Sequence, residues 1–267
     1  MWASKFGLTL VAFQLAACSI NPAWRSLATE GQLASSEIDT GIFRHRVLAN
    51  DMAREIAAEH LFVYVEGDGT PWIREHRLSI DPTPVNPVLL RLMLPASHAA
   101  IYLGRPCYFG LATSPGCNSR WWTVERYGSR VIDSMCAAVN TLAASASSVS
   151  LVGYSGGGAI VVRMSACTGK LASITTIAGN LDPEAWTSLH GYSPLIDDPR
   201  AATLPPPGVQ QTHWQCAADT NVPPAITDAW FESRPTAARR IVDDCAHATG
   251  WEQVLPSLTA GALPGKR

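Results

Sequence analysis

The sequence predicts an α/β fold in which a mostly parallel sheet is covered by helices on both faces. Short runs of β-forming residues alternate with segments of helical periodicity along most of the 267 residues. Hydrophobic residues make up 47% of the chain, which is enough for one sizeable core. A glycine-flanked serine follows one predicted strand, 149–153, and precedes a predicted helix. We expect a single domain over residues 41–267, without a large cap domain.

The first 40 residues predict targeting rather than fold. Residues 1–17 place Lys5 ahead of an apolar run that is too short to span a bilayer. The run ends in Leu-Ala-Ala-Cys at Cys18, which resembles the bacterial lipoprotein box. The resemblance implies removal of this signal peptide, palmitate-type acylation of Cys18, and attachment to the bacterial membrane. Ser19 favours the outer membrane, facing the periplasm or cell surface. The alternatives are an ordinary secretory signal and a retained helix. Polar residues 18–40 are expected to form a tether.

Short apolar segments rich in β-branched and aromatic residues predict the strands, and turn residues bound most of them. The segment 61–66, for example, ends at Gly-Asp-Gly, which is typical of a buried strand that runs into a turn. In chain order we expect strands at 41–48, 61–66, 99–103, 149–153, 174–178, 209–216 and 240–244.

Helices are predicted from capping residues and from apolar spacing. Asn86 and Pro87 are typical of an N-cap and a first helical position. Between residues 119 and 145, apolar residues recur every three or four positions. Residues 183–208 are expected to be a proline-rich connection. We expect helices at 87–94, 119–145, 156–167 and 224–234.

The serine turn carries the strongest functional signal. Residues 153–157 read Gly-Tyr-Ser-Gly-Gly and match G-x-S-x-G. A serine on a sharp turn between strand and helix projects its hydroxyl above the sheet, and the glycines let the neighbouring backbone pass. Here the chain resembles the α/β-hydrolase family over nearly all of residues 55–260. The resemblance implies that Ser155 is a nucleophile.

The family's order of nucleophile, acid and base selects the two partners of the serine. His247 lies just after the last predicted strand, where the family places its catalytic histidine. Asp219 lies in a segment that resembles the family's G-x-x-D-x-x-V-P, with Cys216 in place of the glycine. Asp182 is the alternative acid, although it precedes Pro183 and suits a helix cap.

Two other histidines follow the serine. His213 lies inside a predicted strand and is expected to be structural, whereas His190 lies in the long connection and could line a pocket.

An oxyanion needs two backbone donors. The resemblance assigns them to the N–H groups of Gly156 and Asp68, so the Asp68 carboxylate must turn away. Glu66 stands where relatives often carry histidine. We expect an ion pair between Glu66 and Arg105, and the alternative is recognition of a cationic substrate by Glu66.

The cysteine count supports export. Of seven cysteines, six remain if Cys18 carries lipid, and an even set in an exported chain suits disulfides. The spacings are unlike those of a zinc site, so no metal and no cofactor is expected. The alternative is six free thiols. Cys107 is expected to pair with Cys117, which closes a short loop containing Gly110, Pro115 and Gly116. The helix and strand neighbours that the family's fold implies pair Cys136 with Cys167 and Cys216 with Cys245.

Charge and resemblance together define the expected function. A net charge of −2 gives no footprint for nucleic acid. The resemblance implies hydrolysis of a small-molecule carboxylic ester through an acyl-enzyme. The alternatives are a peptidase or amidase, a thioesterase or haloperoxidase-like enzyme, and a catalytically idle surface-binding lipoprotein. Residues 183–208 are too few for a large cap, which favours an open esterase.

Overall fold

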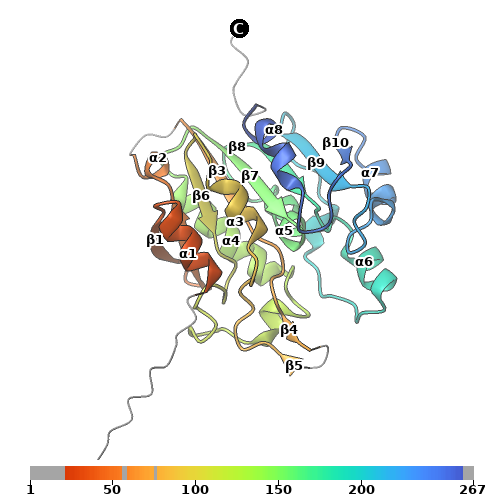
Figure 1. Ribbon diagram of the computed structural model, residues 1–267, viewed down its shortest axis with the longest axis horizontal. Coiled ribbons are helices and arrows are strands. Elements are labelled where there is room, and N and C mark those ends of the chain that lie inside the picture. Colours follow the sequence, from red (N-terminus) through yellow and green to blue (C-terminus); the bar gives the residue numbers. More distant parts are fainter. Residues whose placement is uncertain (1–21, 56–58, 75–76, 261–267) are drawn as a thin grey trace, which may run out of the picture.

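An eight-stranded sheet runs through the middle of the molecule (Figure 1). The computed structural model describes residues 22–55, 59–74 and 77–260. The strands of the sheet are β1 (Ala34–Asp39), β2 (Arg44–Ala49), β3 (His60–Val65), β6 (Ala100–Leu103), β7 (Ser148–Tyr154), β8 (Leu171–Ile177), β9 (Gln210–Cys216) and β10 (Ala238–Val242). Their order is β1-β2-β6-β3-β7-β8-β9-β10. The pairs β1–β2 and β2–β6 are antiparallel, and every other neighbouring pair is parallel.

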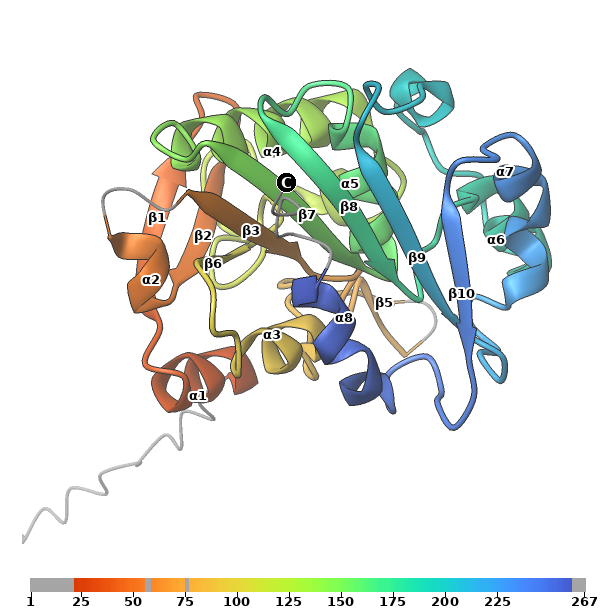
Figure 2. The same cartoon turned by 90° about the horizontal axis from the view of Figure 1, so that it is seen from above.

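Helices cover both faces of this sheet. The helices are α1 (Ala23–Glu30), α2 (Asp51–Arg54), α3 (Val88–Met93), α4 (Ser129–Leu142), α5 (Gly156–Met164), α6 (Pro183–His190), α7 (Asp228–Glu232) and α8 (Leu255–Ala260). Figure 2 shows α1, α3 and α8 on one face, with α4 and α5 on the other. The predicted fold class is therefore confirmed.

The alternation of side chains along β3 explains the two cores. Phe62 and Tyr64 point to the face that α1, α3 and α8 cover. Val63 and Val65 point to the opposite face, where they join side chains of α4 and α5. Because both faces of the strand are buried, its sequence is an almost unbroken apolar run.

The tether predicted over residues 18–40 is wrong for the part that the structure describes. Trp24, Leu27 and Ala28 have helical spacing, and α1 buries all three against the core. β1 then pairs with β2 from Ala34 to Asp39. Most β1 side chains are exposed, so main-chain hydrogen bonds hold this edge strand, and no apolar alternation marks it in the sequence. The signal peptide and Cys18 lie outside the described residues.

The helix predicted over 119–145 begins later than expected. Residues Ser119–Trp122 form a single 3₁₀ turn, and Thr123 then leaves helical geometry. Gly128 is the N-cap of α4, which starts at Ser129. A short hairpin, β4 (Trp72–Ile73) with β5 (Arg77–Leu78), stands in the loop after β3 and was not expected.

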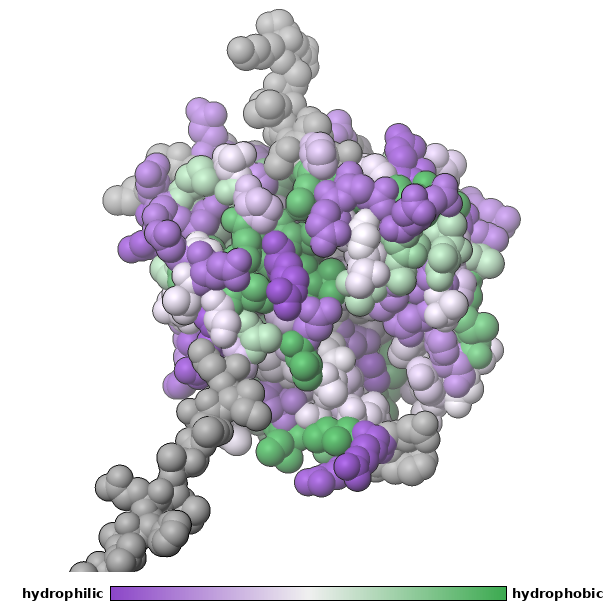
Figure 3. Space-filling view, in the orientation of Figure 1, coloured by the Kyte–Doolittle hydropathy of each residue, from purple (hydrophilic) through white to green (hydrophobic). Residues whose placement is uncertain are grey.

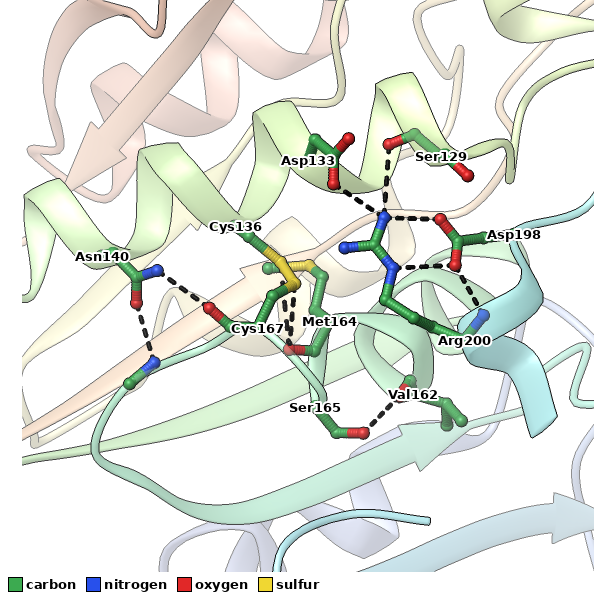
Figure 4. Close-up of a disulfide and its surroundings, with 11 residues drawn as sticks. Ser129, Asp133, Cys136, Asn140, Val162, Met164, Ser165, Cys167, Asp198 and Arg200 are labelled. Carbon is green, nitrogen blue, oxygen red and sulfur yellow. Dashed lines mark hydrogen bonds and ion pairs between the residues drawn. A yellow bond between two sulfur atoms is a disulfide. The ribbon is translucent and has the colours of Figure 1, made fainter. Parts of the chain in front are cut away.

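Three disulfides tie the fold, and they join the expected cysteines. The bond between Cys136 of α4 and Cys167, just beyond α5, links the two helices that flank the serine turn (Figure 4). Asn140 reinforces the link, because its amide donates to the Cys167 carbonyl and accepts the Gly169 N–H. The other two bonds join Cys107 to Cys117 and Cys216 to Cys245.

Candidate active site

Ser155 occupies a strained turn between β7 and α5. Its φ of 50° and ψ of −120° lie outside the common regions for a residue with a side chain. The turn is anchored by the Ser155 N–H, which donates to the Ile177 carbonyl at 3.0 Å. A Cβ on Gly157 would overlap with the carbonyl oxygen of Val65, so glycine here lets α5 start close against β3. The geometry is that expected of the G-x-S-x-G turn.

A chain of hydrogen bonds joins the serine to a histidine and a buried carboxylate. Nε2 of His247 lies 3.0 Å from Oγ of Ser155, and Nδ1 lies 2.7 Å from Oδ2 of Asp219. The Asp219 side chain is completely buried, whereas 20% of the His247 side chain is exposed. Residues from three distant parts of the chain thus meet at one end of the sheet.

Backbone donors hold the carboxylate of Asp219 in place. Oδ1 accepts the N–H groups of Asn221 at 2.8 Å and Val222 at 2.9 Å, which leaves Oδ2 for the imidazole. Burial works against ionisation of Asp219. The hydrogen bond and charge of His247, together with the two N–H groups, outweigh burial and hold the pKa of Asp219 below its ordinary value. Asp219 is therefore an anion at neutral pH.

The loop that carries His247 is fixed by its neighbours. The His247 carbonyl accepts hydrogen bonds from the Tyr154 hydroxyl at 2.9 Å and the Trp251 indole at 2.8 Å. The disulfide between Cys216 and Cys245 ties this loop to the end of β9. The imidazole is thereby positioned from both sides, which limits the freedom that catalysis would otherwise have to remove.

The other sequence candidates have structural partners. Asp182 is the N-cap of α6 and accepts the Ala185 N–H at 2.9 Å, as its helix-cap interpretation expects. His213 is buried, and its Nδ1 lies 2.8 Å from the Thr176 hydroxyl. His190 donates to the Asn221 carbonyl at 2.8 Å. It therefore braces a loop beside the cleft and is not part of the lining.

On the opposite side of the serine, two guanidinium groups, those of Arg105 and Arg126, hold the Asp68 carboxylate in a cationic clamp. Oδ1 pairs with Arg105 at 2.5 Å, and Oδ2 pairs with Arg126 at 3.0 Å. The Tyr127 hydroxyl donates to Oδ2 at 2.7 Å, and the Tyr108 hydroxyl donates to the Asp68 carbonyl at 2.9 Å. Burial alone would raise the pKa of Asp68, but the two guanidinium groups lower it to about 2.

The predicted ion pair between Glu66 and Arg105 is wrong. Arg105 pairs with Asp68, whereas Oε2 of Glu66 accepts the Leu89 and Leu90 N–H groups at 3.0 and 3.3 Å. Glu66 therefore caps α3 from outside, in place of Asn86, whose side chain instead accepts a hydrogen bond from Arg91. Burial raises the pKa of Glu66 to about 7 against these hydrogen bonds.

A cleft of about 1150 Å³ leads to the serine. Its lining includes Ser155 and His247, the turn of residues 66–69, and the loop of residues 70–72 and 84–86. The connection before β9 contributes Trp186, Thr187, Gly191, Tyr192, Ser193 and Leu195. The cleft is large for a small-molecule site, and its apolar lining resembles that of ligand pockets in general.

Sequence reasoning missed the residues that support this site. Arg126 and Tyr127 fell inside the predicted helix over 119–145, where Tyr127 was interpreted as one of the apolar residues at helical spacing. Tyr154 is the unspecified residue of G-x-S-x-G, yet its hydroxyl holds the histidine loop. The one signal in the sequence was the expectation that the Asp68 carboxylate turns away from the oxyanion, which implies a cationic partner for it.

Residues 22–55, 59–74 and 77–260 contain neither a cluster of metal-ligating side chains nor a helix suited to span a membrane. There, no group of three or more His, Cys, Asp or Glu side chains is arranged to hold a metal ion. No helix in the same ranges combines the length and the apolar character needed to cross a bilayer.

Comparison with known proteins identifies the fold. No protein-family model and no curated protein matches the chain. Among solved structures, a lidless α/β serine hydrolase from Xanthomonas campestris has a TM-score of 0.57 at 15% identity, covering 88% of this chain and 97% of its own. A Pyrococcus furiosus esterase gives 0.58 at 12%, covering 94% and 95%. A putative hydrolase from Agrobacterium vitis gives 0.57 at 16%, covering 86% and 98%. The chain therefore has the α/β-hydrolase fold.

Proposed function

We propose that the protein is a serine hydrolase that cleaves carboxylic esters through an acyl-enzyme intermediate. The observation that carries the proposal is the hydrogen-bonded chain from Ser155 through His247 to buried Asp219, at the base of an open cleft. Nucleophile, base and orienting acid in this order of contact are the parts that acyl transfer needs. The likeness to an esterase and a serine hydrolase of the same fold is consistent with it.

The geometry suggests how each step proceeds. As Oγ of Ser155 attacks the ester carbonyl carbon, its proton passes to Nε2 of His247. The carbonyl oxygen becomes an oxyanion, and we assign the N–H groups of Gly156 and Asp68 as its two donors. His247 then gives its proton to the departing alkoxide, and the acyl group stays on Ser155. A water molecule, deprotonated by His247, then attacks the acyl carbon, and His247 returns this proton to Oγ of Ser155 as the acid leaves.

Electrostatics favour these steps on both sides of the serine. The Asp219 anion stabilises the imidazolium that forms in each attack. On the oxyanion side, Arg105 and Arg126 together carry one more charge than the Asp68 carboxylate that they hold. This net positive charge does not repel a developing oxyanion, whereas an unpaired carboxylate would.

A fluorophosphonate probe tests the nucleophile, with a second serine of the same cleft as the control. Ser155→Ala should lose labelling, and p-nitrophenyl butyrate turnover should fall by roughly 10⁶-fold. Ser193→Ala should keep both, because Ser193 lines the same cleft but the hydroxyl that contacts Nε2 of His247 is that of Ser155. Full labelling of folded Ser155→Ala would reject the assignment.

We also propose that the protein is a lipoprotein anchored through Cys18 and exposed to an oxidising compartment. Cys18 and the signal segment lie outside the described residues, so the proposal rests on the resemblance at residues 15–18. Three disulfides in the folded domain support export, since such bonds persist in oxidising compartments and are rare in the cytosol.

A further inference from the structure

The charged side chains that line the cleft already have partners within the protein. Both oxygens of Glu66 accept hydrogen bonds, and both oxygens of Asp68 are ion-paired. Arg126 donates through Nη1 to Asp68 and through Nε to the Thr123 carbonyl. His247 is held between Ser155 and Asp219. Among the described lining residues, these four are the Asp, Glu, Arg, Lys and His residues, so an ionic substrate would meet charged groups that already have partners.

The walls of the cleft are apolar and remain open to water. Val85 is 76% exposed and Tyr192 is 56% exposed, although both line the cleft. Trp72 and Val124 are also exposed there, and Figure 3 shows the apolar residues that gather over the hairpin of β4 and β5. Large apolar side chains that surround a concave site and stay exposed are typical of a surface that a ligand covers.

One of these walls is rigidly joined to the catalytic acid. Trp186 lies edge-on to the rings of His190 and Tyr192, which stack on each other. The Trp186 indole and His190 both donate to the Asn221 carbonyl. The Asn221 N–H in turn donates to Asp219. The aromatic wall is therefore fixed relative to the reacting atoms, and a substrate packed on it would be oriented toward Ser155.

We propose that the ester cleaved here is uncharged and carries a large apolar group, an alkyl chain or an aryl ring, that packs against these walls. The inference rests on the proposed function and adds a substrate class to it. It excludes the sequence-based alternative in which Glu66 binds a cationic substrate, because the Glu66 oxygens are occupied.

A series of p-nitrophenyl esters tests the apolar preference, at concentrations below those at which the esters aggregate. From acetate to octanoate, kcat/KM should rise by roughly threefold to fourfold for each methylene that the cleft buries. The four-carbon butyrate should exceed the four-carbon hemisuccinate by on the order of 100-fold, because the second carboxylate would lose its hydration beside guanidinium groups that Asp68 already pairs. Equal rates for these two esters, or a series that falls with length, would overturn the proposal.

Variants of the cleft wall give a second test with matched controls. Val85→Asp and Val124→Asp should each lower the ratio of octanoate to acetate kcat/KM by about tenfold, since each places a charge on the wall. Ile80→Asp and Ile196→Asp are the controls, because these residues are exposed neighbours that do not line the cleft. They should leave the ratio unchanged. An unchanged ratio in the wall variants would also overturn the proposal.

Fluorophosphonate labelling separates the two possible failures. If Ser155 is labelled but the ester series shows no apolar preference, the substrate class is wrong and the proposed function stands. If Ser155 is not labelled and no ester is cleaved, the proposed function itself fails.

Discussion

The carboxylate of Asp68 packs directly against the Cα of Gly156, the residue after the serine. A Cβ at position 156 would overlap with Oδ1 of Asp68 and with the hydroxyl of Tyr127. A negative group so close to the expected oxyanion would oppose catalysis if it were unpaired. Arg105 and Arg126 remove that conflict, so the clamp and the glycine are parts of one arrangement.

Gly156→Ala should therefore impair catalysis more than folding. The added methyl group displaces the Asp68 carboxylate and with it the peptide that offers the second N–H. Losing one oxyanion donor lowers kcat by about 10²-fold to 10³-fold. Steady-state kinetics with p-nitrophenyl butyrate measure the effect. Gly169→Ala is the control, because a Cβ there makes only an ordinary contact with Asn140. Equal kcat values for the two variants would contradict this account of the turn.

Asp219 and Asp182 can be separated by the same substitution. Asp219→Asn should lower kcat by about 10⁴-fold, because an amide cannot stabilise the imidazolium or select its tautomer. Asp182→Asn should have little effect on kcat or on stability, because asparagine caps a helix as well as aspartate does. Kinetics and thermal unfolding of both variants decide between the residues. An inactive Asp182→Asn beside a normal Asp219→Asn would reverse the assignment of the acid.

The sequence predicted the elements whose signals are local. Strands buried on both faces read as apolar runs, and the order of elements in an α/β sheet brings the ends of β7, β9 and β10 to one edge. The resemblance to the α/β-hydrolase family then assigned Ser155, Asp219 and His247 to that edge. The Asp68 clamp could not be predicted, because Arg105 and Arg126 lie 37 and 58 positions further along the chain, and Arg126 fell inside the helix predicted over 119–145. The edge strand β1 was missed because main-chain pairing leaves no mark on side-chain polarity.

Cys18→Ser tests the anchor. If Cys18 carries the lipid, the variant should move from the membrane fraction to the soluble fraction of the expressing cell, since one acylated residue is the proposed attachment. Immunoblots of both fractions, with esterase activity as a check on folding, measure the change. An unchanged distribution of active protein would reject the lipoprotein proposal and leave the proposed hydrolase chemistry untouched.

Glu66 should make stability depend on pH in the direction opposite to most carboxylates. The Glu66 side chain is buried and accepts the Gly67, Leu89 and Leu90 N–H groups and the Tyr102 hydroxyl, yet burial raises its pKa from 4.5 to about 7. Between these two values the folded state holds a proton that the unfolded state has released. The free energy of unfolding must then fall as pH rises through this window, and the loss is complete above about pH 7.

Glu66→Gln removes the ionisation while keeping the size of the side chain. Relative to wild type, this variant should gain about 2 to 3 kcal/mol in unfolding free energy between pH 5 and pH 8, because wild type alone must bury a charge at the higher pH. Urea denaturation of both proteins at the two pH values gives the difference, and contributions from all other titrating groups cancel in it. Glu59→Gln is the control, because Glu59 is exposed and lies just before β3, and it should show no such trend. A wild-type-to-variant difference that is the same at both pH values would mean that Glu66 ionises equally in the folded and unfolded chains, and that the hydrogen bonds from α3 and Tyr102 fully offset its burial.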